Sequence, residues 1–224
     1  MVRKQTKFDA DKREIVIVPK NENQNKYLSA LRTAQQTIVL GPAGTGKTYI
    51  AASFAASLYL NKKIDKIILT RPNIPAGRSI GFFPGTLEEK MAPWVVPVMD
   101  VLVKHLGHGV VETGIKNGNI QVIPFETMRG RSFEDAFVLL DEAQNTTVPE
   151  IKMFLTRVGE GCRVVLNGDI QQSDLREDSG LFRTIKMVEK YEIPVPIVEF
   201  STEDIVRSDL CRIWVEAFIK EERK

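Results

Sequence analysis

Residues 41–48 read GPAGTGKT, and this stretch decides the fold. It matches the pattern G-x-x-x-x-G-K-[ST], in which the backbone N–H groups of a glycine-rich turn surround phosphate oxygens. The glycines matter because side chains at these positions would obstruct the turn. An apolar run at residues 37–40 precedes the turn, and an alanine-rich helical run at residues 47–60 follows it. The sequence therefore predicts a strand, a phosphate-binding loop and a helix in succession.

The residues of this phosphate loop (41–48) have predicted roles in binding a nucleotide. Lys47 places a positive charge at the β- and γ-phosphates, and the hydroxyl of Thr48 is a ligand for Mg²⁺. The positive end of the helix dipole points at the same anion. An ordinary glycine-rich turn is the alternative, and a chance match in a chain of this length is rare. The predicted nucleotide contacts are Gly41, Pro42, Ala43, Gly44, Thr45, Gly46, Lys47, Thr48 and Tyr49.

A second strand is expected to carry the rest of a metal site. Residues 137–142 read FVLLDE, an apolar strand that ends in two adjacent acids. We expect Asp141 to bind Mg²⁺ through water, and Glu142 to polarise the water that attacks the γ-phosphate. Without a phosphate loop elsewhere in the chain, two solvated acids at a strand end would be the better interpretation.

A third strand end, LNGDIQQ at residues 166–172, carries amide side chains. An amide can hydrogen-bond both the γ-phosphate and the attacking water, and so report whether the γ-phosphate is present. Gln172 is the first choice and Gln171 the second, with an ordinary loop as the alternative. Hydrolysis also gains from an arginine that neutralises charge on the transferred phosphoryl group, supplied by this chain or by a neighbour. The candidates are Arg129, Arg131, Arg183 and Arg207, each of which can equally be a surface charge.

The remaining periodicity predicts alternating strands and helices. Short apolar strands between helices indicate a parallel sheet covered on both faces, with ligands at the carboxyl ends of the strands. A proline-rich and glycine-rich segment at residues 73–86 is expected to be irregular. The predicted strands are 37–40, 66–70, 120–125, 137–140, 163–166 and 196–200, with an edge strand or tail at 15–18. The predicted helices are 47–60, 87–106 (one helix, or two broken near Pro97), 149–158, 180–191 and 205–220.

Composition narrows the class of protein. The chain has 224 residues, 43% of them hydrophobic, a formal net charge of +2 and two cysteines. It has no apolar stretch long enough for a membrane span and no secretory signal, so we expect a cytoplasmic protein with reduced thiols. His105 and His108 flank Gly107 in a predicted loop, but no further ligand near them would complete a metal site. The net charge permits nucleic-acid binding without arguing for it.

The phosphate loop and the two later motifs belong to a longer series of segments. The series is NENQNKYLSAL (21–31), GPAGTGKT (41–48), LTRP (69–72), GFFPGTLEEKMAPW (81–94), PFETMRGRSFEDAFVLLDEAQNTT (124–147), MFLTRVGEG (153–161), NGDIQQSDL (167–175) and DIVRSDL (204–210). Together these segments resemble the PhoH family of ATPases, which is related to superfamily 1 helicases. The resemblance covers nearly the whole chain, and the family's more usual ITGD reads LNGD at 166–169. It implies an α/β fold: a single RecA-like P-loop NTPase domain at 21–224, with a mostly parallel sheet flanked by helices, behind a tail or edge strand at 1–20.

The resemblance also implies roles for individual residues. Gln24 is similar to the glutamine that reads the adenine edge in related helicases, which favours ATP over GTP. Without the family, Gln24 would be taken for a polar surface residue. Gln172 matches the glutamine after Gly-Asp in the third helicase motif. Arg207 matches the arginine of the late family motif and becomes the favoured arginine finger, with Arg131 as its main rival.

A contact with nucleic acid is implied at residues 70–72. Thr70, Arg71 and Pro72 are similar to the helicase segment that touches the backbone of single-stranded nucleic acid, although a strand end closed by a turn is the plainer interpretation. The loop at 73–86 adds Arg78 and an aromatic pair, Phe82 and Phe83. These rings can stack bases, or pack under the loop, which is the commoner arrangement.

The function implied by the resemblance is Mg²⁺-dependent ATP hydrolysis coupled to single-stranded RNA or DNA, as in a helicase-type motor. Because superfamily 1 helicases close two such domains on ATP, one domain alone implies a homo-oligomer, with a hexamer as one candidate. The alternative is an ATP-dependent switch or assembly protein with slow hydrolysis and no nucleic-acid substrate. A small-molecule kinase is weaker still, because adjacent acids suit water activation better.

Overall fold

One parallel sheet organises the domain. The computed structural model describes residues 14–72, 87–175 and 178–222, and over these residues the sheet has six strands. All neighbouring strands pair in parallel, which confirms the predicted α/β class and a single RecA-like domain. The strand order is β3-β2-β4-β5-β1-β6. The bounds are β1 Gln36–Leu40, β2 Lys66–Thr70, β3 Ile120–Val122, β4 Ala136–Leu140, β5 Arg163–Gly168 and β6 Ile197–Glu199.

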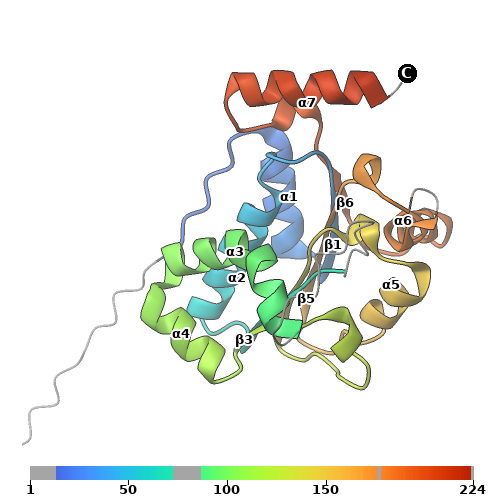
Figure 1. Ribbon diagram of the computed structural model, residues 1–224. Coiled ribbons are helices and arrows are strands. Elements are labelled where there is room, and N and C mark those ends of the chain that lie inside the picture. The colour runs from blue at the N-terminus through green and yellow to red at the C-terminus, as the bar shows by residue number, and fades with distance from the viewer. Residues whose placement is uncertain (1–13, 73–86, 176–177, 223–224) are drawn as a thin grey trace, which may run out of the picture.

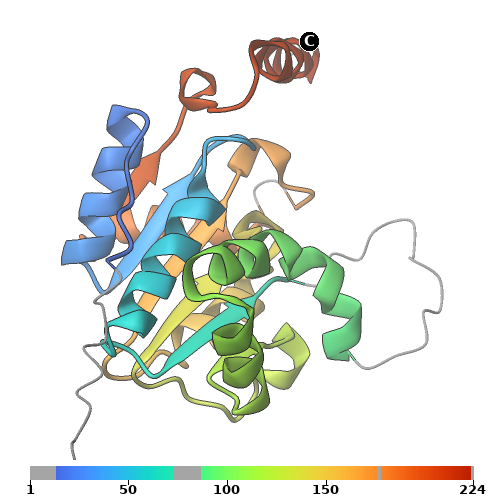
Figure 2. The same ribbon diagram turned by 90° about the vertical axis from the view of Figure 1, so that its left-hand side faces the viewer.

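Helices cover both faces of the sheet (Figure 1). The helices α1 to α4 lie on one face, and α5 and α6 lie on the other. The strand arrows point toward the edge over which α7 lies (Figure 2). The bounds are α1 Glu22–Thr33, α2 Lys47–Leu60, α3 Leu87–Leu106, α4 His108–Lys116, α5 Val148–Leu155, α6 Gly180–Lys190 and α7 Asp209–Glu222.

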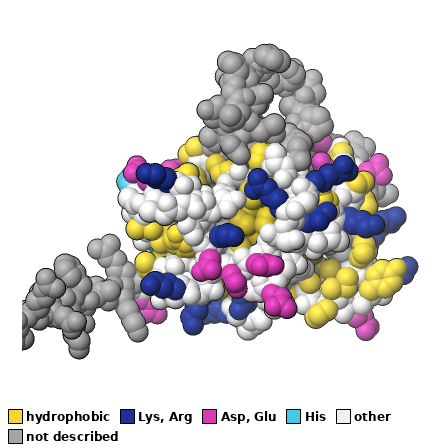
Figure 3. Space-filling model, turned by 90° about the horizontal axis from the view of Figure 1, so that it is seen from below, with side chains coloured by type: hydrophobic (Ala, Val, Ile, Leu, Met, Phe, Trp, Pro, Cys, Tyr) yellow, Lys and Arg dark blue, Asp and Glu magenta, His cyan; other side chains and the backbone are white. Residues whose placement is uncertain are grey.

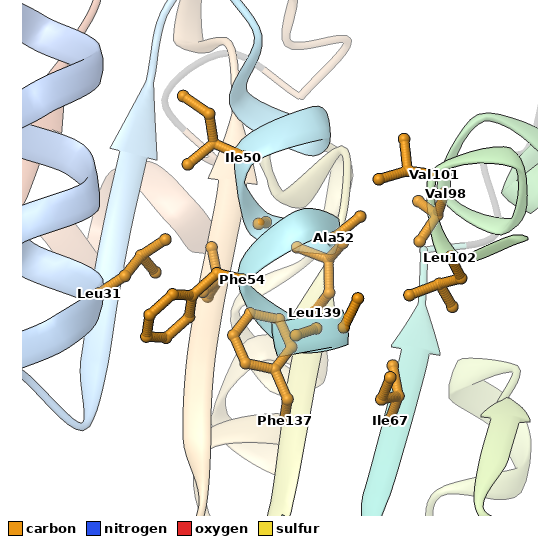
Figure 4. Close-up of a cluster of buried hydrophobic side chains, with 14 of the residues drawn as sticks. Leu31, Ile50, Ala52, Phe54, Ile67, Val98, Val101, Leu102, Phe137 and Leu139 are labelled. Carbon is orange, nitrogen blue, oxygen red and sulfur yellow. The ribbon is translucent and has the colours of Figure 1, made fainter. Parts of the chain in front are cut away.

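Alternation along the strands divides the core into two clusters. In β4, Phe137 and Leu139 face the cluster under α1 to α4, whereas Val138 and Leu140 face the cluster under α5 and α6. Figure 4 shows Phe137 and Leu139 beneath α2, beside residues of α3. Each such fully buried side chain contributes roughly 1.5–3 kcal/mol relative to exposure. Because both faces of β4 are covered, the position of its last residue, and of the acids that follow, is fixed.

The break predicted near Pro97 is wrong, because α3 runs through Pro97 to Leu106. Val98, Val101 and Leu102 are buried against the cluster that α2 shares, and this packing outweighs the one hydrogen bond that proline removes. The break comes instead at Gly107, whose φ of 85° is in the left-handed region. His108 therefore begins α4 rather than lying in a loop.

Other differences lie near the ends of the chain. The helix α1 was not among the predicted elements, although Asn21 caps it by accepting a hydrogen bond from the backbone N–H of Gln24. Residues 14–19 form no strand, so the edge-strand alternative for 15–18 is wrong, and Ile15 and Ile17 instead pack against the core. The division into 1–20 and 21–224 stays a prediction.

The predicted strand 120–125 ends at Val122, and a 3-10 turn occupies Phe125–Thr127. The helix predicted from residue 205 begins only at Asp209. Ser201 and Asp204 form a capping box that closes the short 3-10 helix Thr202–Asp204 first, so the chain turns before α7.

The charged surface at the beginning of the strands and the cleft at their end lie on opposite sides of the domain. Figure 3 views the domain from below, at the edge where the strands begin, and shows Lys and Arg side chains interspersed with a group of acidic ones. The cleft described next lies at the other edge, where the strands end. Among the described residues, no helix combines the length and the apolar character needed to cross a membrane.

Candidate functional site

A cleft of about 470 Å³ lies at the carboxyl ends of β1, β2, β4 and β5. This is the edge at which parallel sheets bind ligands. The helix α3 contributes Pro97 and Val101 to its wall. Of the residues predicted to form the site, those that line the cleft are Ala43, Gly44, Gly46, Lys47, Thr48, Tyr49, Arg71, Asp141, Glu142, Gln172 and Arg207.

The phosphate loop has a backbone shape that requires glycine. Gly41, Gly44 and Gly46 have φ angles of 135°, 86° and 89°. A Cβ atom at Gly41 would lie 2.5 Å from the carbonyl oxygen of Phe200, which belongs to the backbone and cannot easily move. Thr45, fully buried, donates its hydroxyl hydrogen bond to the carbonyl of Pro42 and so closes the turn on itself. The prediction that side chains would obstruct this turn is consistent with these angles and contacts.

Lys47 lies at the base of the loop. Its Nζ donates hydrogen bonds to the carbonyl oxygens of Gly41, at 2.5 Å, and Pro42, at 2.9 Å. Burial lowers the pKa of Lys47, and the negative charges of Asp169, Asp141 and Glu142 act against that lowering. The ammonium group is thus hydrogen-bonded to two backbone carbonyls and lies in the field of three acids that follow two other strands.

Thr48 and Asp141 form a pair suited to a divalent cation. The Thr48 hydroxyl lies 3.4 Å from Oδ1 and 3.5 Å from Oδ2 of Asp141. Burial and then the neighbouring Glu142 raise the pKa of Asp141, while Arg71 is the largest opposing influence. Among the described residues, no three His, Cys, Asp or Glu side chains gather to hold a metal ion alone. Mg²⁺ commonly takes one or two protein oxygens and completes its shell with phosphate and water, so Thr48 and Asp141 fit it.

Glu142 lies in the cleft in an unusual backbone conformation. Its φ of 54° is in the left-handed region, which a non-glycine residue seldom adopts. The carboxylate Oε2 accepts a hydrogen bond of 2.6 Å from Nε2 of Gln144. Strain of this kind is retained where surrounding contacts hold it, and it is enriched at functional sites.

The end of β5 brings a glutamine and a further acid into the cleft. Both glutamines are exposed, but Gln172 lines the cleft and Gln171 does not, so the first choice is better placed. Asp169 also lines the cleft and is 8% exposed, and its burial raises the pKa of its carboxyl group. The sequence reasoning missed Asp169. The signal was present, because Asp169 follows the end of β5 as Asp141 follows the end of β4.

Arg207 is the arginine finger candidate that lines the cleft. The backbone N–H of Val206 donates to the carbonyl of Gly44 at 3.0 Å. A Cβ atom at Gly44 would lie 2.9 Å from Cγ of Arg207, so glycine is what lets this arginine cross the loop. The other three candidates, Arg129, Arg131 and Arg183, are exposed and do not line the cleft.

Comparison with known proteins identifies the family. A family profile described as "PhoH-like protein" matches residues 16–219. The chain belongs to the PhoH family. Protein PhoH of Escherichia coli (strain K12) is 45% identical over 206 residues, which are 90% of this chain and 58% of that protein. The PhoH-like protein of Bacillus subtilis (strain 168) is 41% identical over 204 residues, 90% of this chain and 64% of that protein.

A third relative, the PhoH-like protein of Mycobacterium tuberculosis (strain H37Rv), is 41% identical over 208 residues, 92% of this chain and 59% of that protein. The chain therefore spans about three fifths of the length of these PhoH relatives, from 58% to 64%.

Gln24, whose role came from the PhoH resemblance, lies behind the phosphate loop. It is 4% exposed, its Nε2 donates to the carbonyl of Thr45 at 2.9 Å, and its Oε1 accepts from the backbone N–H of Lys20 at 2.8 Å. Gln24 does not line the cleft, and both ends of its amide contact backbone. This geometry supports the loop directly, and the adenine-reading role stays a prediction.

The three residues implied to touch nucleic acid differ in their exposure to the cleft. Thr70 and Pro72 are buried, whereas Arg71 lines the cleft and acts on Asp141. Arg71 is opposite Asp141 because Thr70 pairs with Leu140 and the N–H of Asp141 donates to the carbonyl of Thr70. Arg78 lies outside the described residues. A nucleic-acid contact here stays a prediction, and of these three residues Arg71 is the one that lines the cleft.

Proposed function

We propose that this PhoH-family chain binds ATP with Mg²⁺, hydrolyses it, and couples turnover to single-stranded RNA or DNA. One observation carries the proposal: a single cleft is lined by Lys47, Thr48, Asp141, Glu142 and Gln172. These residues come from the ends of three different strands. They supply the charge, the cation ligands, the base and the amide that phosphoryl transfer to water requires.

The proposed chemistry follows from the position of each side chain. Lys47 and the loop amides hold the β- and γ-phosphates, and Thr48 and Asp141 hold Mg²⁺, which neutralises phosphate charge when bound. A water oxygen forms a bond to the γ-phosphorus as the bond to the bridging oxygen breaks, leaving ADP and inorganic phosphate. Glu142 accepts the proton of that water. Gln172 orients the water and the γ-phosphate.

The proposal assigns the arginine finger to Arg207, acting within its own chain. Val206 is hydrogen-bonded to Gly44 of the phosphate loop, which supports a role in this cleft rather than in that of a neighbour. Arg131, exposed and outside the cleft, remains the rival that would have to act on a second subunit. We also propose a homo-oligomer, with a hexamer as one candidate. Its test is whether activity per chain rises with protein concentration. Activity that is independent of concentration in a monomer would reject it.

Coupling to single strands is the finer part of the proposal. Arg71 supports it, because it lies in the cleft and continues directly into the segment that carries Arg78. A positive side chain in the nucleotide cleft, followed in sequence by a second arginine, can connect binding of the ATP phosphates to binding of a nucleic-acid backbone outside the cleft. Contacts of this kind with phosphates weaken as salt rises.

The test is phosphate release from ATP, without an added acceptor, in the presence and absence of single- and double-stranded RNA and DNA. We expect Mg²⁺-dependent release, stimulation by single strands, and loss of that stimulation at higher salt. The variant Glu142→Gln, purified in parallel, controls for contaminating ATPases. Release without any stimulation would reject the coupling and favour the switch alternative. Absence of release by a folded, ATP-binding chain would reject hydrolysis.

A further inference from the structure

Gln144 connects two parts of the cleft. Its side chain is 1% exposed, and its Nε2 donates a 2.6 Å hydrogen bond to Oε2 of Glu142. Its Oε1 accepts a 3.1 Å hydrogen bond from the backbone N–H of Asp169. One buried amide thus joins the acid after β4 to the first residue after β5.

Two serine hydroxyls hold the backbone of Gln144. The carbonyl oxygen of Gln144 accepts hydrogen bonds from the hydroxyls of Ser173, at 3.0 Å, and Ser179, at 2.7 Å. A Cβ atom at Gly168 would lie 3.1 Å from Oε1 of Gln144, so the absence of a side chain there lets the amide approach β5. Gln144 therefore has little freedom to move, and Glu142 is held to a rigid partner.

Glu142 needs such a partner because its backbone is in the left-handed region, with φ of 54°. A conformation of that kind persists only where neighbouring contacts determine it. Gln144, two residues along the chain, provides a hydrogen bond to the Glu142 carboxylate, and Glu142 lines the cleft.

We propose that Gln144 is a positioning residue for hydrolysis: its amide orients the Glu142 carboxylate and ties it to the Asp169–Gln172 turn, which follows the neighbouring strand and also lines the cleft. The inference rests on the proposed ATP hydrolysis and adds a residue that does not line the cleft. An amide suits the position. It needs a donor for the Glu142 carboxylate and an acceptor for the Asp169 N–H, and a carboxylate or an apolar side chain supplies at most one of them.

The experiment is a double-mutant cycle on the full chain. Steady-state and single-turnover phosphate release, with KM for ATP, are measured for the parent, Gln144→Met, Glu142→Gln and the double variant. Gln144→Met keeps the side-chain volume and removes both hydrogen bonds. Gln144→Glu keeps the acceptor for the Asp169 N–H, and when ionised it removes the donor to Glu142 and adds a like charge beside it. Gln121→Met is the matched control, because it makes the same substitution at a glutamine of β3 whose amide donates to the carbonyl of Gly118 and does not line the cleft.

We expect both Gln144 variants to lower kcat by about 10- to 100-fold with KM changed less than about threefold. A displaced Glu142 is misaligned with the attacking water, whereas the groups that bind ATP are unchanged. In the Glu142→Gln background, Gln144→Met should add less than about a threefold loss, since the group it positions is already gone. Gln121→Met should leave kcat near the parent value. All rates are taken well below each variant's melting temperature.

Two results would overturn the inference. One is a kcat for folded Gln144→Met and Gln144→Glu equal to that of the parent. The other is the same fold loss in the parent and Glu142→Gln backgrounds, which would make Gln144 a support of the fold alone. A parent chain that releases no phosphate is a separate result: it would reject the proposed function, and the inference with it.

Discussion

The hydroxyl oxygen of Thr48 lies 3.4 Å from Oδ1 of Asp141, across 93 residues of sequence. The contact joins the first turn of α2 to the end of β4. It exists because β1 and β4 flank β5 in a parallel sheet, so the residues that follow both strands meet at one edge. A cation ligated by both oxygens would also meet any phosphate held by the loop that precedes Thr48.

Lys47→Ala should lose productive ATP binding. The variant removes the ammonium group expected at the β- and γ-phosphates, and the lost charge-assisted hydrogen bonds correspond to a Kd about 10- to 100-fold higher. Binding of ATP measured by calorimetry or fluorescence checks this. Lys152→Ala, on the exposed side of α5, is the matched control for loss of one positive charge. Parent-like affinity in Lys47→Ala would remove Lys47 from the site.

Glu142→Gln should retain ATP and hydrolyse it roughly 10²–10⁴-fold more slowly, as expected when a positioned base is lost. The substitution keeps the size of the side chain and an oxygen that can accept from Gln144. Filter binding of labelled ATP and single-turnover phosphate release separate the two effects. Turnover at the parent rate would show that the role assigned to Glu142 is wrong.

The residues at the strand ends could be predicted from the sequence, because the pattern that reveals a strand end is local. A buried parallel strand reads as an uninterrupted apolar run, so its end is visible, and every strand end in such a sheet faces the same edge. Together with the phosphate loop, this argument was enough to expect Asp141 and Gln172 at the same edge, and both line the cleft. The same reasoning applied to Asp169 would have found it, since it also follows a buried strand.

The features of the site and fold that the sequence did not predict depend on packing between distant parts of the chain. The bridge from Gln144 to Glu142 and to Asp169 joins side chain and backbone from two strands, and no spacing rule predicts it. The exclusion of Arg131 from the cleft likewise depends on where a loop turns. The helix α3 was predicted to break near Pro97 on a local rule, and tertiary packing overrode the rule.

Asp141→Asn should stabilise the metal-free protein at neutral pH. Burial and Glu142 raise the pKa of Asp141 in the folded chain. The folded chain then binds more protons than the unfolded one between the two pKa values, so stability falls as pH rises through that window. Above it the full cost of the ionised group remains, and asparagine removes that cost. We expect a higher melting temperature at pH 7 in EDTA, with the gain shrinking toward about pH 4, near the ordinary pKa of aspartate.

The control for this pH series is Glu189→Gln, which removes one negative charge from an exposed position on α6. Mg²⁺ with a non-hydrolysable ATP analogue should reverse the ranking, because asparagine is the weaker ligand and the parent gains more from binding. A lower melting temperature for Asp141→Asn at pH 7 in EDTA would contradict the stated electrostatic cost.

Gly41→Ala should destabilise the domain, whereas Gly109→Ala should not. At Gly41 the φ of 135° is unfavourable for alanine, and the new Cβ would lie 2.5 Å from the carbonyl oxygen of Phe200. That oxygen cannot withdraw cheaply, because the N–H of Phe200 is hydrogen-bonded to Leu40 at the end of β1. Strain of this kind costs on the order of 1–3 kcal/mol.

Gly109 gives the opposite expectation from the same substitution. It lies in the first turn of α4 with nothing within 4 Å of an added Cβ. Alanine is a better helix former than glycine by about 1 kcal/mol at most, so stability should rise or stay level. Urea unfolding of the parent and both variants measures the difference. Equal stabilities for Gly41→Ala and the parent would mean that β6 does not constrain the phosphate loop, and that its glycines serve the ligand rather than the fold.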